Sequence, residues 1–141
     1  MEPGGLIVED RKSALSAFML FCTALTAGIG VISASRSSAG PKLVDTGRSA
    51  FTACAGCHAV TPGHGSYGPN LFGVVGRQAG TAAGSHPSPA LKQSGRIWTP
   101  VNLDAFLAAP AKFIPGNRMP FPGVSDPKRR KAIIAYLQSL K

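Results

Sequence analysis

Two cysteines and a histidine lie within five residues of one another in the segment Cys-Ala-Gly-Cys-His, residues 54–58. Thiol and imidazole groups this close are typical of three kinds of site: a redox-active dithiol, a zinc site, or the attachment point of a c-type haem. The third cysteine of the chain, Cys22, lies in an uncharged N-terminal run, where a small apolar role is expected. The rest of the sequence must therefore decide among the three sites.

A zinc site and a redox dithiol each need partners that the sequence does not supply. Structural zinc takes four ligands, but only His64 and His86 remain, and the adjacent side chains of Cys57 and His58 diverge. A thioredoxin-like dithiol belongs to a βαβ unit, whereas this chain shows no convincing strand. The order C-x-x-C-H favours haem attachment, because two thiols on one helical turn can each bond a porphyrin vinyl group while the histidine faces the iron.

The periodicity of apolar residues predicts an all-α, loop-rich fold. One amphipathic helix is expected over 43–54, and another begins at an N-cap of Thr99 and ends at Pro110. A third is expected after a cap at Ser125 or Asp126, with Pro127 in its first turn. The connecting segments 61–89 and 111–124 are rich in glycine and proline and are expected to be irregular.

Such a domain has a thin core. About 100 residues with long loops bury little apolar surface, and small domains of this kind need an additional stabilising element. A disulfide between Cys54 and Cys57 would close too small a loop to provide it. A large apolar cofactor filling the interior is the expected solution.

The N-terminal segment is apolar and carries no charge over residues 13–35, which is long enough to cross a bilayer as a helix. Arg11 and Lys12 precede it, as expected for an end that stays in the cytoplasm. The expected organisation is a signal peptide or N-terminal membrane anchor (1–35), a linker (36–42) and a haem domain (43–141). The domain is then periplasmic, soluble after signal cleavage or tethered to the inner membrane by residues 13–35.

The net charge of +9 lies entirely in residues 37–141, which hold 12 basic and 3 acidic side chains. This field favours acidic protein surfaces, anionic lipid or nucleic acid. The basic residues are mostly single, and no aromatic-interleaved basic stripe or nucleic-acid motif occurs, so no nucleic-acid partner is expected.

Met119 is the only methionine after residue 35. It lies between Arg118 and Pro120 in a segment with several prolines and glycines, rather than on a helix face, so it is a candidate second ligand for a haem iron opposite His58. A thioether ligand favours ferrous over ferric iron, which suits an electron carrier better than an oxygen carrier or a ligand sensor. Two alternatives are a fixed haem subunit of a membrane electron-transfer complex, and a haem protein with an open sixth site and peroxidase-like activity.

Five blocks between about Val44 and Leu140 together resemble a bacterial class I c-type cytochrome, similar to mitochondrial cytochrome c. They are GRSAFTACAGCH, GPNLFGVVGRQAG, GRIWTP, LDAFLAAPAKFIPGNRMPFPG and IIAYLQSL. The resemblance implies a small cytochrome c fold whose N- and C-terminal helices pack together around one covalently bound haem c. It also implies a monomeric one-electron carrier between respiratory or photosynthetic membrane complexes.

The resemblance assigns roles to individual residues. Cys54 and Cys57 would form the haem thioethers, and His58 and Met119 would be the axial ligands of the iron. The Pro69 carbonyl would accept a hydrogen bond from His58. Arg77 and Trp98 would bond the haem propionates. Gly47 and Phe51 of the first helix would pack against Tyr136 and Leu137 of the last.

Three positions depart from or qualify the family pattern. Phe106 stands where many relatives have a tyrosine that hydrogen-bonds the methionine sulfur, and Pro87, near which a propionate-binding tyrosine would fall, has no hydroxyl. Lys112 is expected to be the one nearby lysine able to replace Met119, because Arg118 stays protonated. Lys112 and Arg118 would also steer the acidic surfaces of redox partners, such as quinol:cytochrome c oxidoreductase, a terminal oxidase or another reductase.

Overall fold

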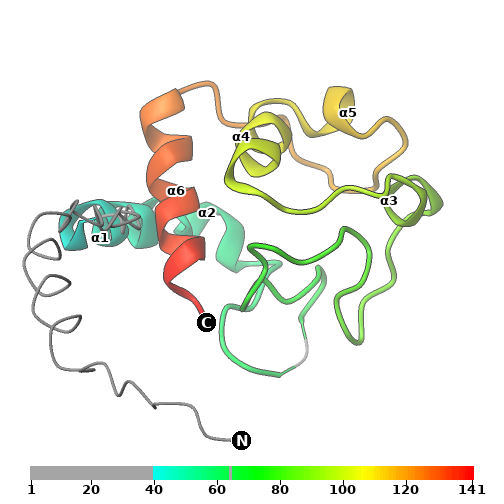
Figure 1. Ribbon diagram of the computed structural model, residues 1–141, viewed down its shortest axis with the longest axis horizontal. Helices are drawn as coiled ribbons and strands as arrows, with labels where there is room; N and C mark the ends of the chain where they lie inside the picture. Colours follow the sequence, from blue (N-terminus) through cyan, green and yellow to red (C-terminus); the bar gives the residue numbers. More distant parts are fainter. Residues whose placement is uncertain (1–39, 64) are drawn as a thin grey trace, which may run out of the picture. The chain divides into compact units, whose positions relative to one another are not determined.

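The computed structural model describes residues 40–63 and 65–141, and within them it is helical, with no strand (Figure 1). The predicted all-α class is confirmed. The helices are α1 (Pro41–Ala50), α2 (Thr52–Ala55), α3 (Pro89–Gln93), α4 (Pro100–Ala108), α5 (Pro110–Phe113) and α6 (Pro127–Ser139). No helix in this part of the chain is long and apolar enough to cross a membrane. The predicted signal peptide or anchor, 1–35, lies outside the described residues.

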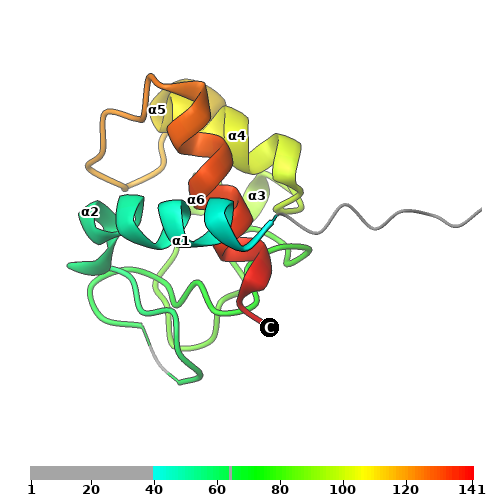
Figure 2. The same cartoon turned by 90° about the vertical axis from the view of Figure 1, so that its left-hand side faces the viewer.

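Helices α1 and α6 cross in close contact (Figure 2). The crossing depends on Gly47, because a Cβ at this position would collide with the backbone carbonyl of Ala132 and approach the Cβ of Tyr136 to 2.8 Å. The ring of Phe51, just after α1, lies 5.5 Å from the ring of Tyr136, centroid to centroid. The pairing of first and last helices expected from the resemblance is confirmed.

The predicted helix caps of α4 and α6 are present. The Thr99 side chain accepts a hydrogen bond from the Asn102 backbone N–H at 3.1 Å. Asp126 accepts one from the Lys128 N–H at 2.8 Å and is therefore the cap of α6. These side chains satisfy donors that an open helix end leaves without partners. The first predicted helix differs slightly: it begins at Pro41, and Phe51 separates α1 from α2.

One short helix forms where irregular structure was predicted, and another begins at the last residue of the other such segment. Pro110 ends α4 as expected, but it also begins α5, because proline lacks an N–H and fits the first turn of a helix. In the same way, Ser88 caps α3 at the end of the glycine-rich segment, accepting a hydrogen bond from the Leu91 N–H. Turn-length helices with a proline at the start carry too few apolar residues for periodicity to reveal them.

The core is small and lies mainly between α1, α4 and α6. The described residues of the segment 56–88 form no helix, and several of their apolar side chains pack against this core. The buried apolar cluster consists of Phe51, Val74, Ala79, Trp98, Leu103, Leu107, Ile114, Ile133, Ile134, Tyr136 and Leu137.

Candidate functional site

Cys54 and Cys57 lie on the last helical turn before the long irregular segment. The backbone N–H groups of Cys57 and His58 both donate to the Cys54 carbonyl, at 3.1 and 3.0 Å. Cys54 is half-buried, Cys57 is exposed, and the two do not form a disulfide. Burial raises the pKa of Cys54, an effect that the nearby Arg129 cation partly opposes. The helical turn therefore presents two thiols and an imidazole within five residues.

The imidazole of His58 is held by a single well-placed partner. Its Nδ1 lies 2.8 Å from the Pro69 carbonyl oxygen. Because a carbonyl can only accept, Nδ1 carries the proton and donates, which leaves the lone pair of Nε2 free to bind a metal. The ring also packs against Gly68, where a Cβ would lie 2.5 Å from Cε1. The Gly-Pro segment thus fixes both the tautomer and the position of the ring.

Asn70 is a supporting residue that the sequence interpretation missed. Its buried Nδ2 donates to the carbonyls of Thr61 and Gly63, at 2.7 and 2.8 Å, and its Oδ1 accepts from the Phe72 N–H at 2.8 Å. These bonds close the loop that carries Pro69. The available signal was an asparagine placed directly after Gly-Pro, because asparagine side chains commonly hydrogen-bond local backbone groups in turns.

Arg77 and Trp98, which the resemblance assigns to the haem propionates, are paired through their backbones. The Trp98 N–H donates to the Arg77 carbonyl at 2.9 Å. The Arg77 guanidinium donates to the backbone carbonyls of Asn70, at 2.6 Å, and Phe72, at 3.3 Å, and its partial burial lowers its pKa. Arg77 therefore also braces the loop that ends at Asn70.

A row of aromatic rings continues from Trp98. Trp98 is 8 % exposed and meets Phe106 of α4 edge-on, with 5.0 Å between ring centroids. Phe106 in turn lies 6.3 Å from Phe113 of α5, and the Arg96 guanidinium covers the Phe113 ring at 4.1 Å. Phe106 is thus an apolar, closely packed side chain with no hydroxyl at its ring edge.

Met119 lies in the irregular segment between α5 and α6 and is half-buried. Its N–H donates to the Asn117 Oδ1 at 2.9 Å, and its carbonyl accepts from the Phe121 N–H at 2.9 Å. The Nδ2 of Asn117 donates to the carbonyls of Pro110 and Ile114, both at 2.9 Å. Asn117 therefore ties the backbone of Met119 to α5, a role that the sequence interpretation did not assign.

The side chains present have the chemistry that a c-type haem requires. Two thiols suit thioether bonds to vinyl groups, and the His58 Nε2 and the Met119 thioether are suitable ligands for iron. Arg77 and the indole N–H of Trp98 can donate to carboxylates such as the propionates. When bound, the haem supplies a reversible one-electron Fe(III)/Fe(II) couple.

Residues 44–141 match the family model for cytochrome c. The chain is a member of the cytochrome c family. This membership makes it an electron-transfer protein that binds one covalent haem c, for which residues 54–58 supply the C-x-x-C-H attachment motif.

Relatives in this family cover most of the described domain. Cytochrome c2 of Rhodopila globiformis is 44 % identical over 90 residues, which are 64 % of this chain and 85 % of that protein. Cytochrome c of Sesamum indicum is 45 % identical over 107 residues, 74 % of this chain and 96 % of that protein. The solved structure of cytochrome cH from Methylobacterium extorquens has 45 % sequence identity and a TM-score of 0.65, and covers 68 % of this chain and 97 % of that one.

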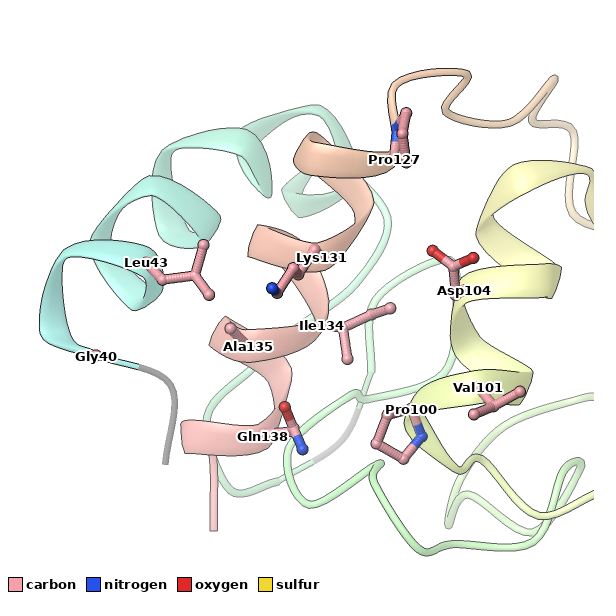
Figure 3. Close-up of a pocket in the computed structure, with 10 residues that line it drawn as sticks. All are labelled: Gly40, Leu43, Pro100, Val101, Asp104, Pro127, Lys131, Ile134, Ala135 and Gln138. Carbon is pink, nitrogen blue, oxygen red and sulfur yellow. The ribbon is translucent and has the colours of Figure 1, made fainter. Parts of the chain in front are cut away.

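Two cavities differ in whether a residue of the attachment motif lines them. One of about 680 Å³ lies between α1, α4 and α6 and contains none of the predicted site residues (Figure 3). A second, of about 330 Å³, is lined by Cys54 together with Phe121, Val124 and Arg129. It brings the basic Arg129 next to a haem-attachment thiol, which the run of charges in the sequence did not reveal. Lys112 and Arg118 are both exposed.

Proposed function

We propose that this cytochrome carries one electron at a time on a haem ligated by His58 and Met119. The observation that carries the proposal is the hydrogen bond from His58 Nδ1 to the Pro69 carbonyl, at 2.8 Å. It leaves Nε2 as the only ring nitrogen with a lone pair, and it makes the imidazole a better electron donor to a metal. In a family that binds haem covalently, this bond prepares His58 for the proximal face of the iron.

The second ligand is proposed to be Met119. It is the single methionine among residues 36–141, and Asn117 fixes its backbone on an irregular segment that is free of helix restraints. Methionine raises the reduction potential by favouring ferrous iron, and with both axial positions filled no substrate can bind to the metal. This arrangement favours electron transfer over peroxidase-like chemistry.

The remaining residues are proposed to tune and protect this centre. Arg77 and Trp98 would neutralise and bind the propionates, although Arg77 also keeps its two backbone partners. The apolar row of Phe106 and Phe113 would keep water from the methionine side. Exclusion of water reduces the solvent rearrangement that accompanies a change of charge.

We propose that electron partners bind through acidic surfaces. Lys112 and Arg118 are exposed on either side of the segment that leads into Met119, and Arg129 lines the cleft at Cys54. Exposed cations accelerate encounter with acidic proteins and do so less at high salt. The partners proposed are periplasmic faces of respiratory or photosynthetic complexes, with the cytochrome acting as a monomer after export directed by residues 1–35.

Stopped-flow oxidation and reduction by membranes that contain quinol:cytochrome c oxidoreductase and a terminal oxidase tests this function. We expect rapid, reversible cycling whose rate falls steeply with ionic strength, and a further fall in the Lys112→Gln and Arg118→Gln variants. Lys141→Gln, at the end of the chain, is the matched control and should leave the rate unchanged. Rates that do not depend on salt would contradict steering, and failure to cycle would contradict the function itself.

A further inference from the structure

The segment that carries Met119 has no regular secondary structure between the end of α5 and the start of α6. A ligand on such a segment leaves the metal whenever the segment opens, and local opening of this kind is governed by the hydrogen bonds and packing that hold its ends. The two ends of the segment are held by different residues.

The leading end is held by Asn117. Its Nδ2 donates to the carbonyls of Pro110 in α5 and of Ile114 just after α5, and its Oδ1 accepts from the Met119 N–H. At the trailing end, the Val124 N–H donates to the Leu107 carbonyl of α4 at 2.8 Å. Gly123, with φ of +110°, packs directly on the Ala108 backbone, where a side chain would collide with the carbonyl. These contacts place the trailing end against the last turn of α4.

Arg130 of α6 adds a fork of four hydrogen bonds at the same place. Its Nη1 donates to the carbonyls of Val124 and Ser125, both at 2.9 Å. Its Nε and Nη2 donate to the two carboxylate oxygens of Asp104 on α4, at 2.8 and 3.3 Å. Figure 3 shows the Asp104 carboxylate pointing from α4 into the space beside α6.

This fork is mostly shielded from water on the arginine side, since the Arg130 side chain is 13 % exposed and that of Asp104 is 45 % exposed. A guanidinium is suited to the place because its donors have a fixed planar geometry that can bind a carboxylate and two carbonyls together. A lysine ammonium carries the same charge but cannot reproduce that arrangement. The bonds therefore link α4, α6 and the Met119 segment through one side chain.

We propose that the Arg130–Asp104 pair is the positioning element that limits how often the Met119 segment opens away from the haem iron. The inference rests on the proposed ligation by Met119. The pair holds carbonyls five and six residues after the ligand. Without the fork, the trailing end keeps the Val124–Leu107 bond and the Gly123 contact, and the open population rises.

Binding of imidazole to the ferric holoprotein measures that open population. Imidazole can bind the iron only where Met119 has left, so its apparent dissociation constant is inversely proportional to the fraction of protein that is open. The titration is followed by loss of the far-red ferric absorption that a methionine–iron bond produces. We expect Arg130→Lys to lower the apparent dissociation constant about tenfold, the scale of one charge-assisted hydrogen bond, and Asp104→Asn to lower it severalfold.

Two controls separate positioning from general loss of stability. Lys128→Arg changes an exposed cation in the first turn of the same helix while keeping its charge, and should bind imidazole as the unaltered protein does. Val44→Ala removes a part-buried methyl pair from α1, away from the segment, and should lower stability to denaturant without a matching gain in imidazole affinity.

Three results would overturn the inference. If the unaltered ferric protein lacks the far-red band, Met119 is not a ligand and the proposed function fails with the inference. If the band is present but neither Arg130→Lys nor Asp104→Asn changes imidazole binding, only the inference fails. If Val44→Ala raises the affinity as much as Arg130→Lys at equal stability to denaturant, the pair acts through general stability alone. If the Arg130→Lys protein does not fold well enough to be isolated, the imidazole affinities of Asp104→Asn and Val44→Ala are compared instead and decide the question.

Discussion

His58 donates from Nδ1 to the carbonyl oxygen of Pro69, eleven positions later in the chain, at 2.8 Å. Asn70 and Arg77 hold the intervening loop through hydrogen bonds to backbone carbonyls, so the position of the Pro69 carbonyl is fixed locally. Orientation of a metal-binding histidine through its second nitrogen fixes both its tautomer and its basicity. The strength of this bond should therefore be reflected in the potential of the centre.

Gly68→Ala probes this relationship directly. The added Cβ would lie 2.5 Å from Cε1 and 2.8 Å from Nδ1 of His58, so the ring or the loop must move and the bond to Pro69 weakens. A less basic imidazole stabilises ferric iron less, and we expect a rise in potential of roughly tens of millivolts in redox titrations. Gly56→Ala, which has open space around it, is the control. Equal potentials in all three proteins would contradict the account.

Phe106→Tyr should shift the reduction potential by roughly tens of millivolts, because a hydroxyl added beside the proposed methionine ligand changes the hydrogen bonding of the site. The ring has a defined place between Trp98 and Phe113, so the new hydroxyl extends from a fixed edge. Phe113→Tyr, further along the same row, provides the comparison and should have a smaller effect. Identical titrations of the unaltered protein and Phe106→Tyr would refute the prediction.

Lys112→Ala should raise the pH at which the far-red ferric band is lost by about one unit, since the one nearby lysine expected to replace Met119 is removed. Lys112 is exposed on α5, on the side of Asn117 and the leading end of the segment. Arg118→Lys is the opposite change: it supplies a second amine and should lower that pH. Unaltered pH profiles in both variants would show that another group displaces the methionine.

Gly47→Ala should destabilise the fold by about 3 kcal/mol, the upper range for forcing a methyl group into a packed contact. The new side chain has no space between α1 and the backbone of Ala132. Ser49→Ala, on an exposed position of the same helix, serves as the reference. Urea unfolding of the holoproteins measures the difference in the free energy of unfolding. Equal unfolding midpoints for Gly47→Ala and Ser49→Ala would show that α1 and α6 can move apart to accommodate the methyl group with little loss of stability.

The sequence was sufficient for the main helices because their ends carry explicit signals. Thr99 and Asp126 are capping residues followed by proline, and both caps occur in the structure. The start of α3 carries the same signal, because Ser88 is a capping residue followed by Pro89, but neither α3 nor α5 could be predicted from periodicity, since helices of four or five residues have no apolar period. Their positions depend on tertiary packing around Ser88 and Pro110.

The same difference separates the site residues that the sequence predicts from those that it does not. Cys54, Cys57 and His58 can be recognised as a haem-attachment motif from a single sequence, because few other kinds of site use these residue types in that order. Asn70, Asn117 and Arg130 were not predicted as site residues. Each acts through backbone carbonyls three to nine residues away, and a lone polar side chain gives no indication of which carbonyls the folded chain will bring to it.

The central claim, ligation of one haem by His58 and Met119, is tested most directly by the far-red absorption of the oxidised holoprotein and its Met119→Leu variant. We expect the unaltered protein to show the methionine–iron band. Met119→Leu should lose the band, bind imidazole without competition and fall in potential by on the order of 0.1 V, within the range that axial ligands control. A band that persists in Met119→Leu, or that is absent from the unaltered protein, would contradict the account.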